Sequence, residues 1–222
     1  MGRSSSAIWS AARSPRCRRR CCASSCRGIE RRLRIVGGAW RGRALAAPAG
    51  RITRPTADRV RQAAFDMLLH AAWGGAAALE GVRVLDAFAG TGAFGLEALS
   101  RGAGHAVFLE RDRAALAALR ANIAACGAEA RCTVIPGDAL RPPGMPPCGL
   151  VFLDPPYGAG LVERCIGALS AAGALAEDAL IVAELGRDED MPAPGAILGA
   201  IRGAILAERA RGAARLVVWR RA

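Results

Sequence analysis

Residues 82–103, VRVLDAFAGTGAFGLEALSRGA, decide the fold. An apolar strand pattern leads into a turn that contains Gly90 and Gly92, and the residues after the turn are typical of a helix. This order of strand, glycine-rich turn and helix predicts the first half of a βαβ unit, from which parallel sheets are built. Together with Gly95 the turn has the spacing G-x-G-x-x-G, which by itself is compatible with a dinucleotide site.

The same alternation continues along the chain. Further strands are predicted for 105–110, 131–139, 149–156 and 178–185, and helices for 111–127 and 160–173. The stretch 204–221 predicts an antiparallel hairpin that turns at Arg211 and Gly212. We therefore expect an α/β protein with a mostly parallel, seven-stranded, Rossmann-like sheet, helices on both faces and a C-terminal antiparallel hairpin.

Three acids lie at the ends of the first three predicted strands. Asp86, four residues before Gly90, would repel a pyrophosphate, but it suits a ligand with a cationic amino-acid end such as S-adenosylmethionine. Glu110 follows Gly90 by 20 residues, and its two oxygens can accept both hydroxyls of a ribose. Asp138 is placed to reach the adenine edge. The structural alternatives are helix caps, solvated strand ends and, for Asp138, turn chemistry.

The stretch LVFLDPPYG, residues 150–158, places Asp154 at the carboxyl end of the fourth predicted strand. The exocyclic amine of a base is a poor nucleophile, because its lone pair is delocalised into the ring. Asp154 and the Pro155 carbonyl supply two pre-placed acceptors for its N–H groups, and Tyr157 offers a face for stacking. The alternative is an ordinary strand followed by a proline turn, with Tyr157 only packing.

The N-terminal part predicts a small module before the sheet. Residues 33–47, LRIVGGAWRGRALAA, predict two short strands around a turn. Within residues 51–73 a helix is predicted that starts at Asp58 as its N-cap, because Val60, Ala64, Met67 and Leu68 then recur at helical spacing.

The positive charge of the chain, +12 in total, is concentrated at its beginning. Residues 1–34 carry +9 and residues 35–61 carry +5, whereas residues 62–222 carry −2. A basic module on a near-neutral body favours a polyanionic partner such as nucleic acid. Composition bias is the alternative, because all 31 cationic residues are arginine. Our hypothesis for an RNA-docking surface comprises Trp40, Arg41, Arg43, Arg54, Thr56, Arg59 and Arg61.

Residues 1–32 are expected to form a disordered basic extension, because they are rich in Arg and Ser and show no amphipathic period. A transit peptide and an upstream extension remain alternatives. The four cysteines in this stretch match no usual zinc spacing, and the four later ones are expected to be small buried residues in a reducing compartment, so no metal is predicted. No apolar run approaches the roughly 18 residues of a membrane span, so we expect a soluble cytoplasmic protein.

Two pairs of motifs carry a resemblance to known proteins. The stretches LDAFAGTGAFGLEALSRGA and FLDPPYG resemble class I S-adenosylmethionine-dependent methyltransferases that modify exocyclic amines. RIVGGAWRGRAL followed by RPTADRVRQAAFDML closely resembles the RsmD family, whose members methylate N2 of a guanine in small-subunit ribosomal RNA. The resemblance covers roughly residues 33–221.

The resemblance implies a role for each matching residue. The target amine is expected at Asp154, Pro155, Pro156 and Tyr157. S-adenosylmethionine is expected at Asp86, Phe88, Ala89, Gly90, Gly92, Glu110, Arg111, Asp138 and Ala139. The division expected is an extension at 1–32, an RNA-docking hairpin and helix at 33–72, and a methyltransferase domain at 73–222. The partner implied is small-subunit ribosomal RNA or the assembling subunit, with the protein acting as a monomer.

Three other functions remain open at this point. A DNA adenine-N6 or other exocyclic-amine methyltransferase would share the Asp154 motif, because that motif fixes the chemistry and not the substrate. A nicotinamide-dependent oxidoreductase explains the glycine spacing but gives the Asp154 motif no function. A non-catalytic RNA-binding protein would keep the cofactor site only as a relic.

Overall fold

The computed structural model describes residues 33–48, 55–158, 160–190 and 205–221. The predicted extension at 1–32, with its four cysteines, and Arg54 of the predicted docking surface lie outside these residues. The contacts within the described part group it into one compact unit, which begins at Arg31.

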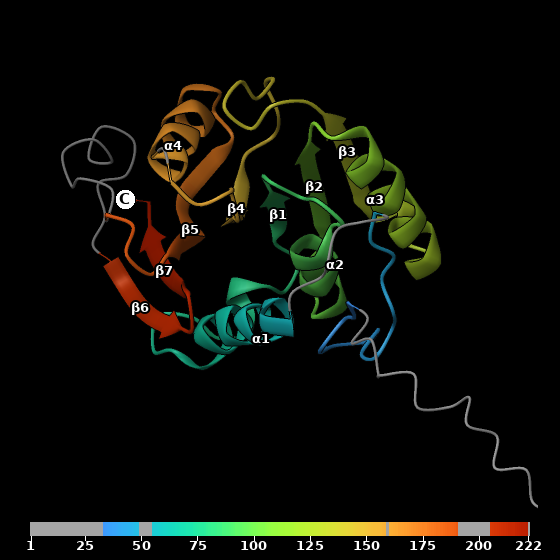
Figure 1. Ribbon diagram of the computed structural model, residues 1–222, viewed down its shortest axis with the longest axis horizontal. Coiled ribbons are helices and arrows are strands. Elements are labelled where there is room, and N and C mark those ends of the chain that lie inside the picture. Colours follow the sequence, from blue (N-terminus) through green and yellow to red (C-terminus); the bar gives the residue numbers. More distant parts are fainter. Residues whose placement is uncertain (1–32, 49–54, 159, 191–204, 222) are drawn as a thin grey trace, which may run out of the picture. The chain divides into compact units, whose positions relative to one another are not determined.

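Seven strands form one sheet in the order β3-β2-β1-β4-β5-β7-β6 (Figure 1). They are β1 Arg83–Asp86, β2 His105–Glu110, β3 Cys132–Pro136, β4 Cys148–Leu153, β5 Leu175–Gly186, β6 Ile205–Arg211 and β7 Ala214–Arg220. The first five are parallel, whereas β7 runs antiparallel to both β5 and β6. The predicted α/β class, the strand number and the C-terminal hairpin are all confirmed.

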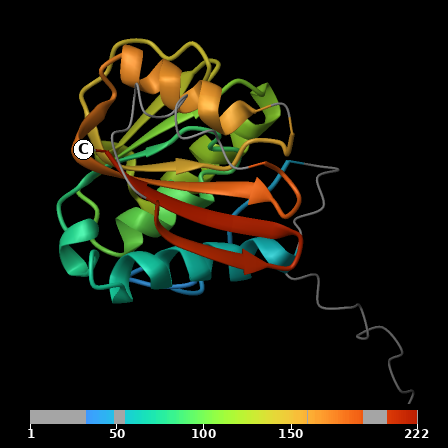
Figure 2. The same ribbon diagram turned by 90° about the vertical axis from the view of Figure 1, so that its left-hand side faces the viewer.

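Among the described residues, the helices that cover the sheet are α1 Pro55–His70, α2 Ala93–Ser100, α3 Arg113–Cys126 and α4 Leu161–Ala171. Figure 2 shows α4 on one side of the sheet and α1 with α2 on the other. Alternate strand residues feed the two layers: Val84 and Phe108 join the core under α1, α2 and α3, whereas Leu85 and Val107 join the core under α4. Within the described part of the chain, no helix is both long and apolar enough to cross a membrane.

The centre of the sheet is a point where the chain reverses its direction of winding. From β1 the chain proceeds outward to β2 and β3, then returns to pair β4 beside β1 and continues outward on the other side to β5. Loops on either side of such a point diverge, so they leave a crevice at the carboxyl ends of the strands. This topology positions the candidate site.

Residues 33–45 form a loop with a single antiparallel bridge, Arg34 to Ala44, where two short strands were predicted. The hydrogen bond from Ile35 N–H to the Arg43 carbonyl, 2.9 Å, gives it the course of a hairpin. Its apolar residues belong to the same core as the sheet. The assignment of RNA docking to residues 33–72 and of methyl transfer to residues 73–222 stays a prediction.

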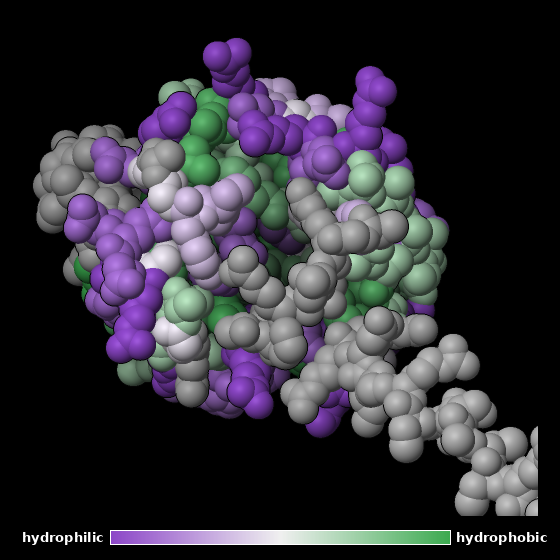
Figure 3. All heavy atoms as spheres, in the orientation of Figure 1, coloured by the Kyte–Doolittle hydropathy of each residue, from purple (hydrophilic) through white to green (hydrophobic). Residues whose placement is uncertain are grey.

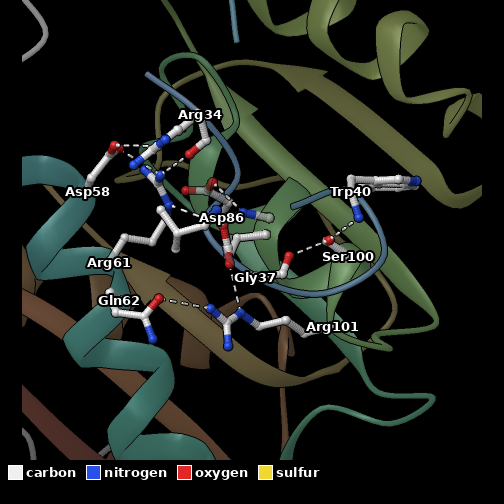
Figure 4. Close-up of polar contacts among 12 residues, drawn as sticks. Arg34, Gly37, Trp40, Asp58, Arg61, Gln62, Asp86, Ser100 and Arg101 are labelled. Carbon is white, nitrogen blue, oxygen red and sulfur yellow. Dashed lines mark hydrogen bonds and ion pairs between the residues drawn. The ribbon is translucent and has the colours of Figure 1, made fainter. Parts of the chain in front are cut away.

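The hairpin lies against the end of α2, and Gly38 makes this possible. Its φ is +74°, and a Cβ there would lie 1.9 Å from the Ser100 carbonyl oxygen. Ser100 completes the contact, because its hydroxyl accepts the Trp40 N–H (2.9 Å) and donates to the Gly37 carbonyl (2.7 Å), as Figure 4 shows.

Helix α1 begins at Pro55, so the prediction that Asp58 is its N-cap is wrong. Proline suits the first position of a helix, because its missing N–H would have no partner there and its φ is already helical. Asp58 lies instead in the first turn, where its Oδ1 accepts a hydrogen bond of 2.9 Å from Arg61.

A buried carboxylate, Glu97 of α2, connects three segments. It is 0% exposed, and it accepts the Val36 N–H of the hairpin and the Arg101 Nε–H, both at 2.7 Å. Arg61 of α1 lies 3.6 Å from the same carboxylate and donates to the Arg34 carbonyl. Figure 4 shows Arg61 pointing toward Arg34, on the same side of α1 from which Gln62 meets Arg101.

The four described cysteines are free, and Cys126, Cys148 and Cys165 are buried as predicted, whereas Cys132 is half-buried. Burial raises the pKa of the Cys165 thiol to about 12, so this thiol stays protonated and behaves as a small apolar group. Among the described residues, no group of three or more His, Cys, Asp or Glu is placed to hold a metal ion.

We expect Glu97→Gln to destabilise the protein by about 3–5 kcal/mol, because it removes the charge that compensates Arg101 and leaves the buried Arg61 paired with Asp58 alone. The measurement is urea unfolding followed by circular dichroism. The matched control is Glu129→Gln, an exposed residue on the short helix Glu129–Arg131, which should change stability by less than about 0.5 kcal/mol. Equal midpoints for the two variants would contradict the role of Glu97.

Candidate active site

A cavity of about 1070 Å³ opens at the carboxyl ends of the parallel strands. Figure 3 shows this face hollowed near its centre, with apolar residues inside and polar residues around the rim. The cavity brings together nearly all of the predicted site residues, namely Asp86, Phe88, Ala89, Gly90, Glu110, Arg111, Asp138, Ala139, Asp154, Pro155, Pro156 and Tyr157. Its size is at the upper end of the roughly 300–1,000 Å³ of ligand pockets, so it has room for more than one group.

Gly92 does not line the cavity, although it was predicted as a cofactor residue. Its φ is +80°, and a Cβ there would lie 2.3 Å from Cδ1 of Leu119 in α3. Gly92 therefore serves the turn and the packing of α3 against the start of α2.

Asp86 ends β1 at the floor of the cavity and is only 2% exposed. One of its oxygens accepts the Gly95 N–H in the first turn of α2, at 3.0 Å, so the predicted helix-cap alternative is present here. Burial raises the pKa of Asp86 to about 7, with a further rise from Glu110, whereas the Gly95 N–H and Arg61 act in the opposite direction. A buried carboxylate of this kind gains most from a cationic ligand.

Glu110 ends β2 and holds the glycine turn in place. Its carboxylate accepts three backbone N–H groups, from Gly90 at 2.7 Å, Arg111 at 2.8 Å and Asp112 at 2.7 Å. Because a carboxylate offers about four acceptor positions, these bonds leave capacity for a ligand hydroxyl. Glu110 therefore holds the glycine turn, and its contact with a ribose stays a prediction.

Asp138 follows β3 in a turn at the edge of the cavity. Its Oδ1 accepts the Leu140 N–H at 3.0 Å, which is the turn chemistry weighed for this residue. Its Oδ2 lies 3.8 Å from the Arg111 guanidinium, and both side chains are substantially exposed. Such an exposed ion pair adds little stability, so the pair is better placed to meet a ligand than to hold the fold.

The Asp154 motif follows β4 directly and faces the cavity. Asp154 is exposed and Pro155 is buried, so the turn is anchored while the carboxylate reaches solvent. Tyr157 is 43% exposed, which is unusual for so large an apolar ring. Its hydroxyl donates a hydrogen bond of 2.5 Å to Glu184 Oε1, near the end of β5.

Sequence reasoning missed Glu184, which also lines the cavity. A signal was present, because IVAEL places one acid in an otherwise apolar strand pattern, as VLD and FLD do. The acid was treated as part of a strand, since nothing in the sequence tells which residue of a buried run reaches the strand end.

Sequence reasoning also missed Asn122, the single asparagine of the chain. It is buried in α3, accepts the Ala46 N–H at 2.7 Å and donates to the carbonyls of Ala46 (3.0 Å) and Thr91 (2.9 Å). One amide therefore joins the end of the hairpin to the glycine turn. The signal was a lone amide in an alanine-rich helix, but its partners lie too far away in the sequence to be foreseen.

The predicted docking surface is only partly at the surface. Arg41, Arg43 and Arg59 are exposed. Arg61 is 1% exposed, so its prediction as a surface contact for RNA is wrong. The basic pattern did not reveal this, because the acids that enclose Arg61 come from two different helices. Thr56 lies in α1, and its side chain is outside the described set.

Trp40 is half-buried, and the guanidinium of Arg131 lies 5.1 Å from the centre of its ring. Arg43 beside it donates to the Ala125 carbonyl at the end of α3. Arg131, which sequence reasoning did not include, therefore extends the basic surface from the hairpin to the loop before β3.

The chain has clear relatives of known class. The family model described as Conserved hypothetical protein 95 matches residues 33–213. Ribosomal RNA small subunit methyltransferase D of Escherichia coli is 41% identical over 163 residues, which are 72% of this chain and 78% of that protein. The protein of the same name from Haemophilus influenzae is 35% identical over 168 residues, 73% of this chain and 83% of that protein.

Solved structures of similar proteins point to the same class. The methyltransferase yhhF of Escherichia coli is 36% identical, with a TM-score of 0.69 and coverage of 85% of this chain and 97% of that one. A 16S rRNA guanine-N2 methyltransferase of Thermus thermophilus, solved with AdoMet and guanosine, is 16% identical with a TM-score of 0.59, covering 78% of this chain and 44% of that one, and shows the shared fold. The chain belongs to the Conserved hypothetical protein 95 family, the RsmD family of methyltransferases.

Proposed function

We propose that this protein transfers a methyl group from S-adenosylmethionine to the exocyclic N2 amine of a guanine in small-subunit ribosomal RNA. One observation carries the proposal: the Asp154 motif and the three acids Asp86, Glu110 and Asp138 line one cavity at the carboxyl ends of the parallel strands. The relatives named above supply the RNA class. The oxidoreductase alternative loses its support, because the family is one of methyltransferases and the dinucleotide interpretation leaves Asp154 without a function.

The donor set of the cavity fits S-adenosylmethionine. Asp86, Glu110 and Asp138 line the cavity. Asp86 would hold the cationic amino-acid end, Glu110 the ribose and Asp138 the adenine edge, so three carboxylates would meet a ligand rich in N–H and O–H donors. The same acids would repel the pyrophosphate of a dinucleotide. The bound cofactor supplies a methyl group on a positively charged sulfur.

The residues after β4 prepare the amine for attack. Asp154 and the carbonyl of Pro155 accept its two N–H groups, which turns the nitrogen lone pair out of the ring plane and toward the methyl carbon. The methylated amine must lose one proton, which would pass through the exposed Asp154 carboxylate to solvent, while the electrons of the broken carbon–sulfur bond would remain on sulfur. Because the buried Pro155 anchors the turn that carries both acceptors, little reorganisation is needed at the moment of reaction.

The exposed arginines of the hairpin and α1 are the proposed contacts to the RNA backbone. Arg41, Arg43 and Arg59 carry charge that the near-neutral body does not balance. Trp40 with Arg131 adds an aromatic surface backed by a cation. Phosphate contacts of this kind position the RNA, while the cavity selects the base.

A deletion strain tests the function directly. Small-subunit RNA from a strain that lacks this protein should lose one guanine N2 methyl group, and the wild-type gene should restore it. Asp154→Ala should not, because losing one oriented acceptor costs about 10²–10³ in rate. The measurement is a methylation map of the RNA, with the rate of methyl transfer by purified protein beside it.

Glu110→Ala is the matched comparison for Asp154→Ala. Both remove a carboxylate from the same cavity, but we assign Glu110 to the cofactor. Calorimetry should show weaker S-adenosylmethionine binding for Glu110→Ala and binding within a few-fold of wild type for Asp154→Ala. The roles are misassigned if the two variants lose the same property.

Cofactor affinity should depend on pH through Asp86, whose pKa burial raises to about 7. The ammonium of the cofactor favours the ionised carboxylate, so below this pH binding must first release a proton. The dissociation constant should therefore rise about 10- to 30-fold between pH 7.5 and 5.5. In Asp86→Asn, binding should be weaker throughout and nearly independent of pH over this range; an equal slope in both proteins would rule out Asp86 as the titrating group.

Replacing Arg41 and Arg43 together by Ala should weaken RNA binding and lower the slope of log affinity against log salt by roughly one to two units. Cofactor binding should not change. The control pair is Arg164→Ala with Arg209→Ala, two exposed arginines on α4 and β6. If both pairs change the salt slope equally, the RNA is docked by net charge and not by the hairpin.

A further inference from the structure

Glu184 occupies the position beside the Asp154 motif on the next strand. β4 and β5 are parallel, and Leu153 pairs with Ala183, so Asp154 and Glu184 are the next residues along the two strands. Both line the cavity, and the hydroxyl of Tyr157 donates to Glu184 Oε1 at 2.5 Å. The structure therefore places a second carboxylate on the side where the target base is proposed to lie.

The cavity has two halves, divided between β1 and β4. The acids assigned to the cofactor follow β1, β2 and β3, whereas Asp154 and Glu184 belong to β4 and β5 on the other half of the sheet. The proposed function uses Asp154 and leaves Glu184 without a task. Glu184 is half-buried and accepts the Tyr157 hydroxyl, and a carboxylate has further acceptor positions that the donors of a base could reach.

Guanine is the base whose edge matches two acceptors side by side. Its N1–H and its N2 amine are neighbouring donors. Adenine and cytosine present a ring nitrogen that is an acceptor next to their amine, and a carboxylate facing that nitrogen would be repelled. Enzymes that act on a single base read it in this way, through the hydrogen bonds of its pairing edge.

We propose that Glu184 selects guanine by accepting the ring N1–H, while Asp154 and the Pro155 carbonyl hold the N2 amine. Tyr157 fixes Glu184 through its hydroxyl and offers its ring to the base. A carboxylate has about four acceptor positions, so the Tyr157 bond does not exhaust it. This inference rests on the proposed function and adds to it the origin of the choice of base.

The competing explanation is that Glu184 only holds Tyr157 in place. The two explanations differ in what the N1 proton of the substrate contributes. If Glu184 reads N1–H, replacing the carboxylate matters only for a base that has this proton. If Glu184 merely positions Tyr157, its loss affects every base alike, and Tyr157→Phe should reproduce it.

The experiment compares two RNA fragments ligated from synthetic pieces, with guanine or 2-aminopurine at the methylated position. 2-Aminopurine keeps the N2 amine but lacks the N1 proton. The wild-type protein should prefer guanine by about 10- to 100-fold in kcat/KM, which is the factor expected from one hydrogen bond to a charged group. Glu184→Gln should lose about this factor on guanine and change by less than about threefold on 2-aminopurine, so its preference collapses.

Tyr157→Phe is the matched control, because it removes the hydroxyl bond and keeps the ring. Because the Glu184 carboxylate remains in Tyr157→Phe, this variant should keep most of the preference for guanine over 2-aminopurine, whereas Glu184→Gln should lose it. Cofactor affinity and the unfolding midpoint should be unchanged in Glu184→Gln. If Glu184→Gln slows both substrates equally, Glu184 does not read the base and the inference is overturned. If the wild-type protein methylates no guanine in the RNA, the proposed function itself fails, which is a separate result.

Discussion

The buried carboxylate of Glu97 is the constraint on which the arrangement of the N-terminal part depends. A charge without solvent must be compensated, and here the compensation comes from Arg61 of α1, Arg101 of α2 and the Val36 N–H of the hairpin. Removing any one of these groups leaves the charge of Glu97 less well compensated. The hairpin and α1 are therefore parts of the catalytic body, and residues that follow the hairpin form a wall of the cavity.

Three acids of the cavity each hold the backbone, and each is also proposed to bind the cofactor. Asp86 caps α2, Glu110 ties the glycine turn to β2, and Asp138 closes its own turn. These bonds hold the carboxylates in place before any ligand arrives, so little ordering is left to be done on binding. The acids that hold helix α2 and the turns at the strand ends are therefore the same acids for which we propose a chemical role.

The sequence predicts well what depends on neighbouring residues. Apolar runs that end in an acid predicted the strands, and they also predicted that Asp86, Glu110 and Asp154 would lie at the strand ends where the cavity opens. What failed depends on distant partners. Arg61 was taken for a surface charge because Glu97, 36 residues later, becomes its neighbour only after folding. Asn122 and Glu184 were missed for the same reason, since pairing across 76 residues or between β4 and β5 leaves no local pattern.

The amide of Asn122 has a consequence for how the two substrates communicate. It is bonded at once to Ala46, which follows the proposed RNA-docking hairpin, and to Thr91, in the turn that lines the cofactor half of the cavity. A ligand that moved either segment would act on the other through this one side chain, because Asn122 is bonded to both. Thermodynamic linkage would make such an effect reciprocal: if bound RNA raised the affinity for the cofactor by some factor, the bound cofactor would raise the affinity for RNA by the same factor.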